Sequence, residues 1–265
     1  EGRFRVLGRR RAYCGYHQRE GSSLAALDEI VFNQKLLTME QVLHAMSTNY
    51  EDMETVPAGP EIRAILLNKA PKFGNDDERA DKWVVELEDY IGSSYRYKYR
   101  SSKYGKGPVP CCYSYSQSPV TGNIAFGKSI GATPDGRKDG QPVNNGISPA
   151  NGSEKKGATA ACNSVMKLPS IWFQKGAIFN MRLSKGALDT DENKEKVIAM
   201  IKVLFENYGQ QIQFNVVDNK VFREAMEHPD EYKDLMVRVS GYSALFTSLS
   251  PECQMDVINR AELEL

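Results

Sequence analysis

Apolar residues recur at helical spacing through roughly the first hundred positions. In residues 23–36 they return every three or four positions, which predicts an amphipathic helix. A second helix is predicted to begin at Thr38, because Thr38 and Gln41 form a capping-box pattern. Two more helices are predicted over 60–69 and 76–103, the longer one polar. The first part of the chain is therefore expected to be mainly helical.

From about residue 108 the pattern changes. Short β-like runs at 111–117 and 124–130 predict strands, and a stretch rich in Gly, Asn and Pro follows at 131–157. The elements predicted after it are a helix at 158–167, a strand at 177–183, a helix at 191–208, a strand at 211–217 and a helix at 219–235. Strands that alternate with helices indicate an α/β fold.

Composition narrows the classes of function. The 265 residues carry equal numbers of basic and acidic side chains, so nothing favours nucleic acid or a polyanionic substrate as a partner. No apolar run is long enough to cross a membrane, and the Arg-rich residues 1–20 lack the apolar segment of a secretory signal. Five cysteines without metal-site spacing suit a reducing compartment. A cytoplasmic location and no bound metal are the expectations.

Gly241 interrupts an apolar, strand-like run near the end of the sequence. One interpretation is a bulge or a tight bend, the usual reason for a glycine inside a strand pattern. The other is a stored radical. A carbon-centred radical at Cα is most stable when planar, shared between the flanking amide nitrogen and carbonyl, and a side chain would clash in that geometry. Such a radical has to be kept from solvent, and the apolar flanks suit that requirement.

The residues around Gly241 follow a long motif that resembles the radical loop of the glycyl radical enzymes, the family of pyruvate formate-lyase and glycerol dehydratase. The matching positions are Arg238, Val239, Gly241, Tyr242, Ala244, Phe246, Leu249, Gln254 and Arg260. The resemblance implies that Gly241 carries the catalytic radical, and that Arg238 and Tyr242 hold the loop without acid–base roles. A closing helix is predicted after Ser250, a good N-cap that precedes Pro251.

Three more segments are similar to the same family: 66–77, 131–137 with 146–149, and 213–217. The resemblance extends over about 22–263. It implies a glycyl radical enzyme-type β/α barrel, of which this chain would form a C-terminal half-barrel with outer helices. The domains expected are a mainly helical part of the lyase domain at 22–107 and the half-barrel at 108–265, with the glycine radical domain at about 217–265.

The resemblance also implies partners. In the family an activating enzyme, which uses S-adenosylmethionine and an iron–sulfur cluster, removes a hydrogen atom from the glycine. The glycyl radical enzyme then binds no cofactor of its own. The stored radical oxidises a cysteine to a thiyl radical, which abstracts hydrogen from a small-molecule substrate. Full-length members are expected to be homodimers and to work anaerobically.

The family's catalytic cysteine, often within Gly-Cys-x-Glu, has no counterpart in this sequence. The pair Cys111–Cys112 is an alternative, since pyruvate formate-lyase uses adjacent cysteines, but its position before residues 131–137 favours a structural role. Cys162 and Cys253 are interpreted as packing residues, and Cys14 lies in unassigned sequence. The chain is therefore interpreted as a portion of a longer enzyme, inactive alone.

Residues 1–21 depart from the family pattern and remain unassigned. They are rich in arginine, and the match resumes abruptly near Ser22. A basic nucleic-acid arm is one interpretation, against which the neutral net charge argues. The hypothesis preferred is a frame error or an altered gene boundary, which resequencing through the codon for Ser22 would test.

The function expected is the radical-bearing part of a glycyl radical lyase or dehydratase. Two alternatives of another class are a non-catalytic radical-carrying subunit that docks onto a cysteine-bearing protein, and an inactive fragment. Within the family, the formate acetyltransferase and arylacetate decarboxylase branches also remain open.

Overall fold

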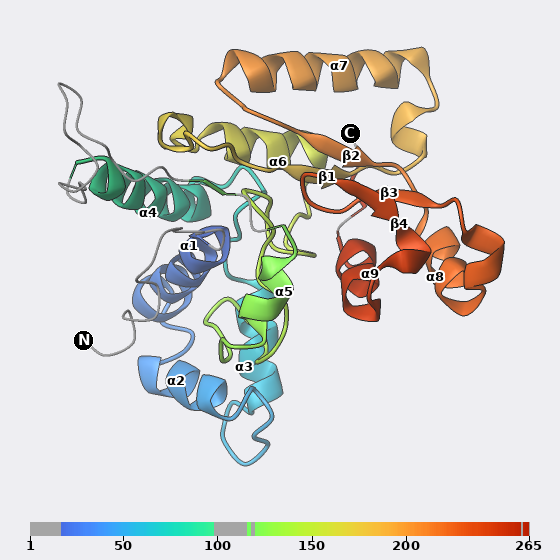
Figure 1. Cartoon of the computed structure of the whole chain (residues 1–265). Helices are drawn as coiled ribbons and strands as arrows, with labels where there is room; N and C mark the ends of the chain where they lie inside the picture. The colour runs from blue at the N-terminus through green and yellow to red at the C-terminus, as the bar shows by residue number, and fades with distance from the viewer. Residues whose placement is uncertain (1–16, 98–115, 118–119, 261, 265) are drawn as a thin grey trace, which may run out of the picture.

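The computed structural model describes residues 17–97, 116–117, 120–260 and 262–264 (Figure 1). Its α-helices are α1 (His17–Ala26), α2 (Met39–Ser47), α3 (Gly59–Asn68), α4 (Glu78–Tyr97), α5 (Gly122–Gly127), α6 (Gly157–Met166), α7 (Asp191–Glu206), α8 (Asn219–Glu227) and α9 (Pro251–Ile258). Its strands are β1 (Asn180–Arg182), β2 (Gln213–Asn215), β3 (Met236–Arg238) and β4 (Ser243–Leu245).

The first helices form a small layer with its own apolar core. α1 runs into a π-helical segment, η2 (Leu27–Asn33), and together they pack with α2 and α3 around buried residues such as Ile30 and Leu66. The predicted capping box is present, since the Gln41 N–H donates to Thr38 Oγ1 and the Thr38 N–H donates to Gln41 Oε1. The first helix begins at His17, inside the segment that the sequence left unassigned.

A parallel strand pair joined by a helix forms the centre of the fold. β1 pairs with β2 in parallel, with Met181 opposite Phe214, and α7 makes the crossover between them. Parallel neighbours need such a crossover, because a short turn cannot return the chain to the same edge. The largest apolar core lies here, among β1, α4, α6 and α7. The chain is therefore a mixed α/β structure, as predicted.

A third unit contains Gly241. β3 and β4 form an antiparallel hairpin, with Val237 opposite Ala244, and α8 and α9 lie below it (Figure 1). Its core is closed by Phe222 of α8 against Phe246, whose ring centroids lie 4.7 Å apart. The hairpin joins the central strands because Asn215 of β2 bonds the backbone of β3 at Arg238.

One predicted element is wrong, and another is too long. The run 124–130 is not a strand, since Gly122–Gly127 form the short helix α5. Its buried residues are Asn123, Ile124 and Gly127. Ile124 lies one position and Gly127 four positions after Asn123, which places all three on one helical face, and the packing of that face overrides the alternating pattern. The helix expected over 219–235 ends at Glu227, and a 3-10 turn, η5 (Pro229–Tyr232), follows it.

Of the strand predicted at 111–117, only residues 116–117 lie in the described part. There Gln117 forms a parallel bridge with Ala177, just before β1.

Candidate functional site

Gly241 lies in the turn between β3 and β4. The turn is closed by the Val239 N–H, which donates to the Tyr242 carbonyl at 2.9 Å. The φ of Gly241 is +79°, in the left-handed region that a residue with a Cβ adopts only at a cost. The backbone therefore favours glycine here, whatever chemistry the residue performs.

Few atoms surround Gly241. Its N–H donates to Gln213 Oε1 at 3.2 Å, and a Cβ at this position would stand 3.0 Å from Ile178 Cδ1. Gln213 belongs to β2 and Ile178 precedes β1, so the turn sits over the central strand pair. Yet Gly241, Tyr242 and Ser243 are all exposed.

The expected apolar shield is only half present. Val239 is 2% exposed and Phe246 is fully buried, as predicted, but Leu245 is 41% exposed and Ala244 is half-buried. In a two-stranded hairpin, side chains alternate between its faces, and only one face packs on the core of its own unit. The described residues anchor the turn from below and leave its outer side open.

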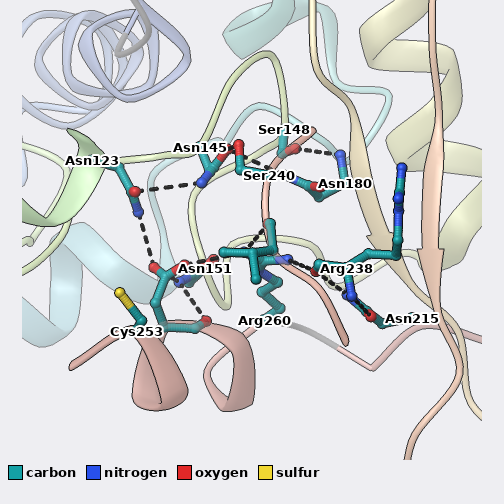
Figure 2. Close-up of polar contacts among 12 residues, drawn as sticks. Asn123, Asn145, Ser148, Asn151, Asn180, Asn215, Arg238, Ser240, Cys253 and Arg260 are labelled. Atoms are coloured by element: carbon teal, nitrogen blue, oxygen red, sulfur yellow. Dashed lines mark hydrogen bonds and ion pairs between the residues drawn. The ribbon is translucent and has the colours of Figure 1, made fainter. Parts of the chain in front are cut away.

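Arg260 holds the hairpin from below. Its guanidinium donates to the Val239 carbonyl at 2.7 Å and to the Arg238 carbonyl at 3.2 Å, and it pairs with Asp256 of α9 at 3.2 Å (Figure 2). Arg260 and Asp256 are both buried. Because the arginine satisfies two carbonyls just before Gly241, α9 is coupled to the start of the turn.

Asn145 meets the turn from the opposite side. Its Oδ1 accepts from Ser240 Oγ at 2.6 Å and from Asn180 Nδ2 at 3.2 Å, and its Nδ2 donates to Asn123 Oδ1 at 3.4 Å. Figure 2 shows the chain of polar side chains from Asn145 through Asn123 towards α9, which closes where Asn123 Nδ2 meets Asp256 Oδ1 at 3.0 Å. The residue before Gly241 is thus fixed by a buried amide network.

Arg238 contacts both the neighbouring strand β2 and the start of β4. Its backbone exchanges two 2.8 Å hydrogen bonds with the Asn215 side chain, and its guanidinium donates to Ser243 Oγ at 2.9 Å. Tyr242 differs, because it holds the turn through its backbone carbonyl while its ring is partly exposed.

Two free cysteines, Cys162 and Cys253, lie in the described part of the chain. Cys162 is buried in α6, and burial raises the pKa of its thiol to about 11, which keeps it protonated and unreactive. Cys253 lies half-buried on α9. Cys14 and the pair Cys111–Cys112 lie outside the described residues.

Within the described ranges, no group of three or more His, Cys, Asp or Glu side chains is placed to hold a metal ion. In the same part of the chain, no helix is both long and apolar enough to cross a membrane.

Two family models match the chain. Residues 143–247 match the model described as Glycine radical, and residues 20–126 match the model described as Pyruvate formate lyase-like. The first contains the hairpin and the second contains the helical layer.

Relatives and solved structures agree with these models. The probable dehydratase YbiW of Escherichia coli (strain K12) is 38% identical over 244 residues, 91% of this chain and 29% of that protein. The trans-4-hydroxy-L-proline dehydratase of Clostridioides difficile is 35% identical over 242 residues, again 91% of this chain and 29% of the relative. The glycerol-bound form of the B12-independent glycerol dehydratase from Clostridium butyricum superposes with a TM-score of 0.83 at 36% identity, over 94% of this chain and 30% of that one.

The chain therefore belongs to the glycyl radical enzymes. It spans only about 29% of the length of these curated relatives, and within that span it holds the region matched by the glycine radical model. Isethionate sulfite-lyases and formate acetyltransferases of the family also match it.

Sequence reasoning identified the hairpin but missed most of its support. Asn145 carried no signal of its own, since nothing in a Gly- and Asn-rich loop shows which amide meets the turn. Asn123 stands just before a run that was predicted as a strand, and Gln213 was interpreted only as part of the family-like segment 213–217. The segment 146–149 next to Asn145 was interpreted only as part of a family-like loop.

Proposed function

We propose that this chain is the radical-bearing part of an anaerobic glycyl radical lyase or dehydratase, with Gly241 as the catalytic residue. Its relatives of known name include two dehydratases and several sulfite-lyases. The domain division at 22–107 and 108–265, with a glycine radical domain from about 217, belongs to the proposal, as does a place for 108–265 within a β/α half-barrel.

The chemistry begins with the loss of one hydrogen atom from the Cα of Gly241. A radical S-adenosylmethionine activating enzyme, with its iron–sulfur cluster, takes that atom, so this chain needs no cofactor of its own. The glycyl radical then takes a hydrogen atom from the thiol of a cysteine that is not present in this chain. This restores the glycine and leaves a thiyl radical, which removes hydrogen from a small-molecule substrate before elimination.

The observation that carries the proposal is the geometry of the turn. Gly241 has a left-handed φ that a side chain adopts only at a cost, Arg260 holds the carbonyls of Arg238 and Val239 just before it, and Gly241 itself is exposed. An anchored but uncovered glycine suits a carbon that an activating enzyme reaches and a cysteine later approaches. Covering it against solvent and oxygen is then the task of the rest of the enzyme.

Electron paramagnetic resonance tests this. The chain is incubated anaerobically with a radical S-adenosylmethionine activase of a dehydratase relative, S-adenosylmethionine and reductant. A doublet is expected, split by the hydrogen that remains on Cα, and it is expected to be absent in Gly241→Ala. Gly140→Ala is the matched control, because Gly140 has a similar φ of +74° in open space away from the hairpin. A doublet that survives in Gly241→Ala would refute the assignment.

A second function is favoured by the exposed side of the hairpin. The chain could serve as a radical-carrying subunit that docks onto a separate protein bearing the cysteine. Exposed Met236, Tyr242 and Leu245 would meet that protein. Co-purification of the activated chain with a cysteine-bearing relative, and substrate turnover only in the mixture, would support this function over an inactive fragment.

The branch of the family is a further part of the proposal. The dehydratase relatives match over 91% of this chain, whereas the formate acetyltransferase of Haemophilus influenzae matches over 81% and that of Escherichia coli over 72%. This favours elimination chemistry over acetyl transfer. A homodimer and a cytoplasmic location are expected by analogy with the family.

A further inference from the structure

A cavity of about 520 Å³ opens between α3, the loop at 131–137, the loop at 150–155 and α9. This volume lies within the range of about 300–1,000 Å³ typical of small-molecule sites. The charged residues that line it are five basic ones and two acidic ones: Arg19, Arg63, Lys72, Arg137 and Lys155 against Asp135 and Asp256. The chain as a whole has no net charge, so this is a local excess of positive charge.

Both carboxylates are already engaged. Asp135 pairs with Arg19 at 2.5 Å and accepts from Thr133 Oγ1 at 2.5 Å. Asp256 pairs with Arg260 and accepts from the side-chain amides of Asn123 and Asn151. Within the described residues, no carboxylate lies within ion-pair distance of the side chains of the other lining cations, Lys72, Arg63, Arg137 and Lys155.

Arg137 differs from the other three. Its guanidinium is surrounded by backbone carbonyls, including Gln141 O at 2.6 Å and Ile130 O at 2.8 Å. These bonds fold the loop 131–141 around it, which makes Arg137 a structural residue of the cavity wall.

Lys72, Arg63 and Lys155 have few hydrogen-bond partners within the described part of the chain. Lys72 is 8% exposed, and its ammonium makes one hydrogen bond, to Leu66 O at 2.6 Å. Arg63 donates through Nε alone, to Gly136 O at 2.9 Å, and the Lys155 ammonium has no partner in the described part of the chain. An ammonium offers three donors and a guanidinium five, so most donors on these side chains are unused.

A purely structural account covers only part of this. Lys72 bonds a carbonyl in the last turn of α3, where a cation also stabilises the helix end. That contact uses one donor of Lys72 and does not involve half-buried Arg63 or exposed Lys155, whose free donors face the cavity or solvent. Burial lowers the pKa of Lys72 to about 8, with the nearby charges of Arg19 and Lys155 acting in the same direction and that of Asp135 acting against them.

We propose that this cavity binds a small anion that carries phosphate or carboxylate groups, with Lys72, Arg63 and Lys155 as its cationic contacts. Asn151 and Ser153 line the same wall, and their side chains donate to Asp256 and to the Phe73 carbonyl, which fixes the wall in place. Because α9 contributes Asp256 and Asn259 to the cavity, the bound anion would bridge the helical layer and the unit that holds Gly241. This site is separate from the proposed radical chemistry, and either assignment can fail without the other.

Isothermal titration of the purified chain with inorganic phosphate, and separately with citrate, tests the site. Saturable binding of at least one of the two is expected, and the tighter one identifies the class of anion. Lys72→Met should weaken binding by about tenfold, as expected for the loss of one charge-assisted contact. Lys175→Met is the matched control, an exposed lysine away from the cavity, and should leave the affinity unchanged.

The proposal would be overturned by the absence of saturable heat from either anion, with a folded circular dichroism spectrum, or by equal affinities for the wild-type chain and Lys72→Met. If Lys72→Met does not fold, the half-buried Arg63→Gln decides in its place. Weakening by Lys175→Met as large as that by Lys72→Met would also overturn it, since that result indicates general charge screening.

Discussion

At Gly241 the backbone and the proposed chemistry require the same residue. A φ of +79° disfavours a side chain on steric grounds, and a planar Cα radical disfavours one as well. This is why the sequence pointed to Gly241 so directly. Asn145 stands at the other extreme, because any amide in residues 141–152 could have met Ser240, and only the folded chain brings the two together.

The two requirements on Gly241 can be separated by stability. Gly241→Ala is expected to lower the free energy of unfolding by about 1–2 kcal/mol, the usual cost of a left-handed alanine. Urea titration measures this, and Gly140→Ala should cost a similar amount because its φ is alike. Both variants would then be similarly destabilised while only Gly241→Ala loses the radical. Loss of the radical in both variants would indicate that backbone strain causes the loss.

Glu154 gives a pH-dependent prediction. Its Oε2 is buried without a hydrogen bond among the described residues, and burial raises the pKa of this carboxyl from 4.5 to about 7. A raised pKa in an acid penalises the folded state once the unfolded chain ionises. The contribution of Glu154 is therefore most favourable below pH 4.5 and is lost as the pH rises to about 7.

Glu154→Gln should accordingly stabilise the chain at pH 8, by up to about 3 kcal/mol, and by less at pH 5. Thermal melts at the two pH values measure the difference. Glu195→Gln, which changes an exposed carboxylate on α7, is the control and should shift neither melt appreciably. A smaller gain for Glu154→Gln at pH 8 than at pH 5 would contradict the argument.

At the scale of elements, the sequence predicted best where local contacts decide. Thr38 and Ser250 are N-caps in the structure because each cap needs only the next turn of its own helix. α5 was missed because distant residues decide it. Gly127 packs directly against the backbone of Gln141, and Asn123 reaches Asp256, contacts that no local pattern contains.

The coupling of α9 to the hairpin yields a third prediction. Arg260→Met would leave Asp256 without its buried cationic partner and remove the guanidinium from the Arg238 and Val239 carbonyls, a loss of about 3–5 kcal/mol for a broken buried pair. Hydrogen exchange at residues 236–246 should then accelerate more than exchange in α4. Arg223→Met, on the exposed face of α8, is the matched control. Equal acceleration throughout the chain would show global destabilisation without specific coupling.

At the scale of the whole molecule, the chain after the hairpin returns to the central strands and pairs beside β1. Leu263 pairs in parallel with Leu183 beside β1, where its N–H donates to the Arg182 carbonyl at 2.9 Å. The buried Arg182 guanidinium pairs with Glu262 at 2.5 Å, and the Ala158 N–H of α6 donates to the Glu264 carbonyl at 2.8 Å. The sequence predicted the closing helix but not this return, since pairing partners of an extended tail depend on tertiary position.

Exposure of the activated chain to air tests how the returning tail is held. Oxygen is expected to cut the backbone at Gly241, which leaves β4, α9 and the tail as a short fragment. That fragment should stay bound. Its Phe246 and Leu263 are buried, and its Glu262 forms an ion pair with Arg182 in the other fragment. Native size exclusion should give one peak that separates into two polypeptides under denaturing electrophoresis. In Gly241→Ala the chain should remain whole, and release of the fragment under native conditions would mean that the hairpin, and not the tail, holds this unit in place.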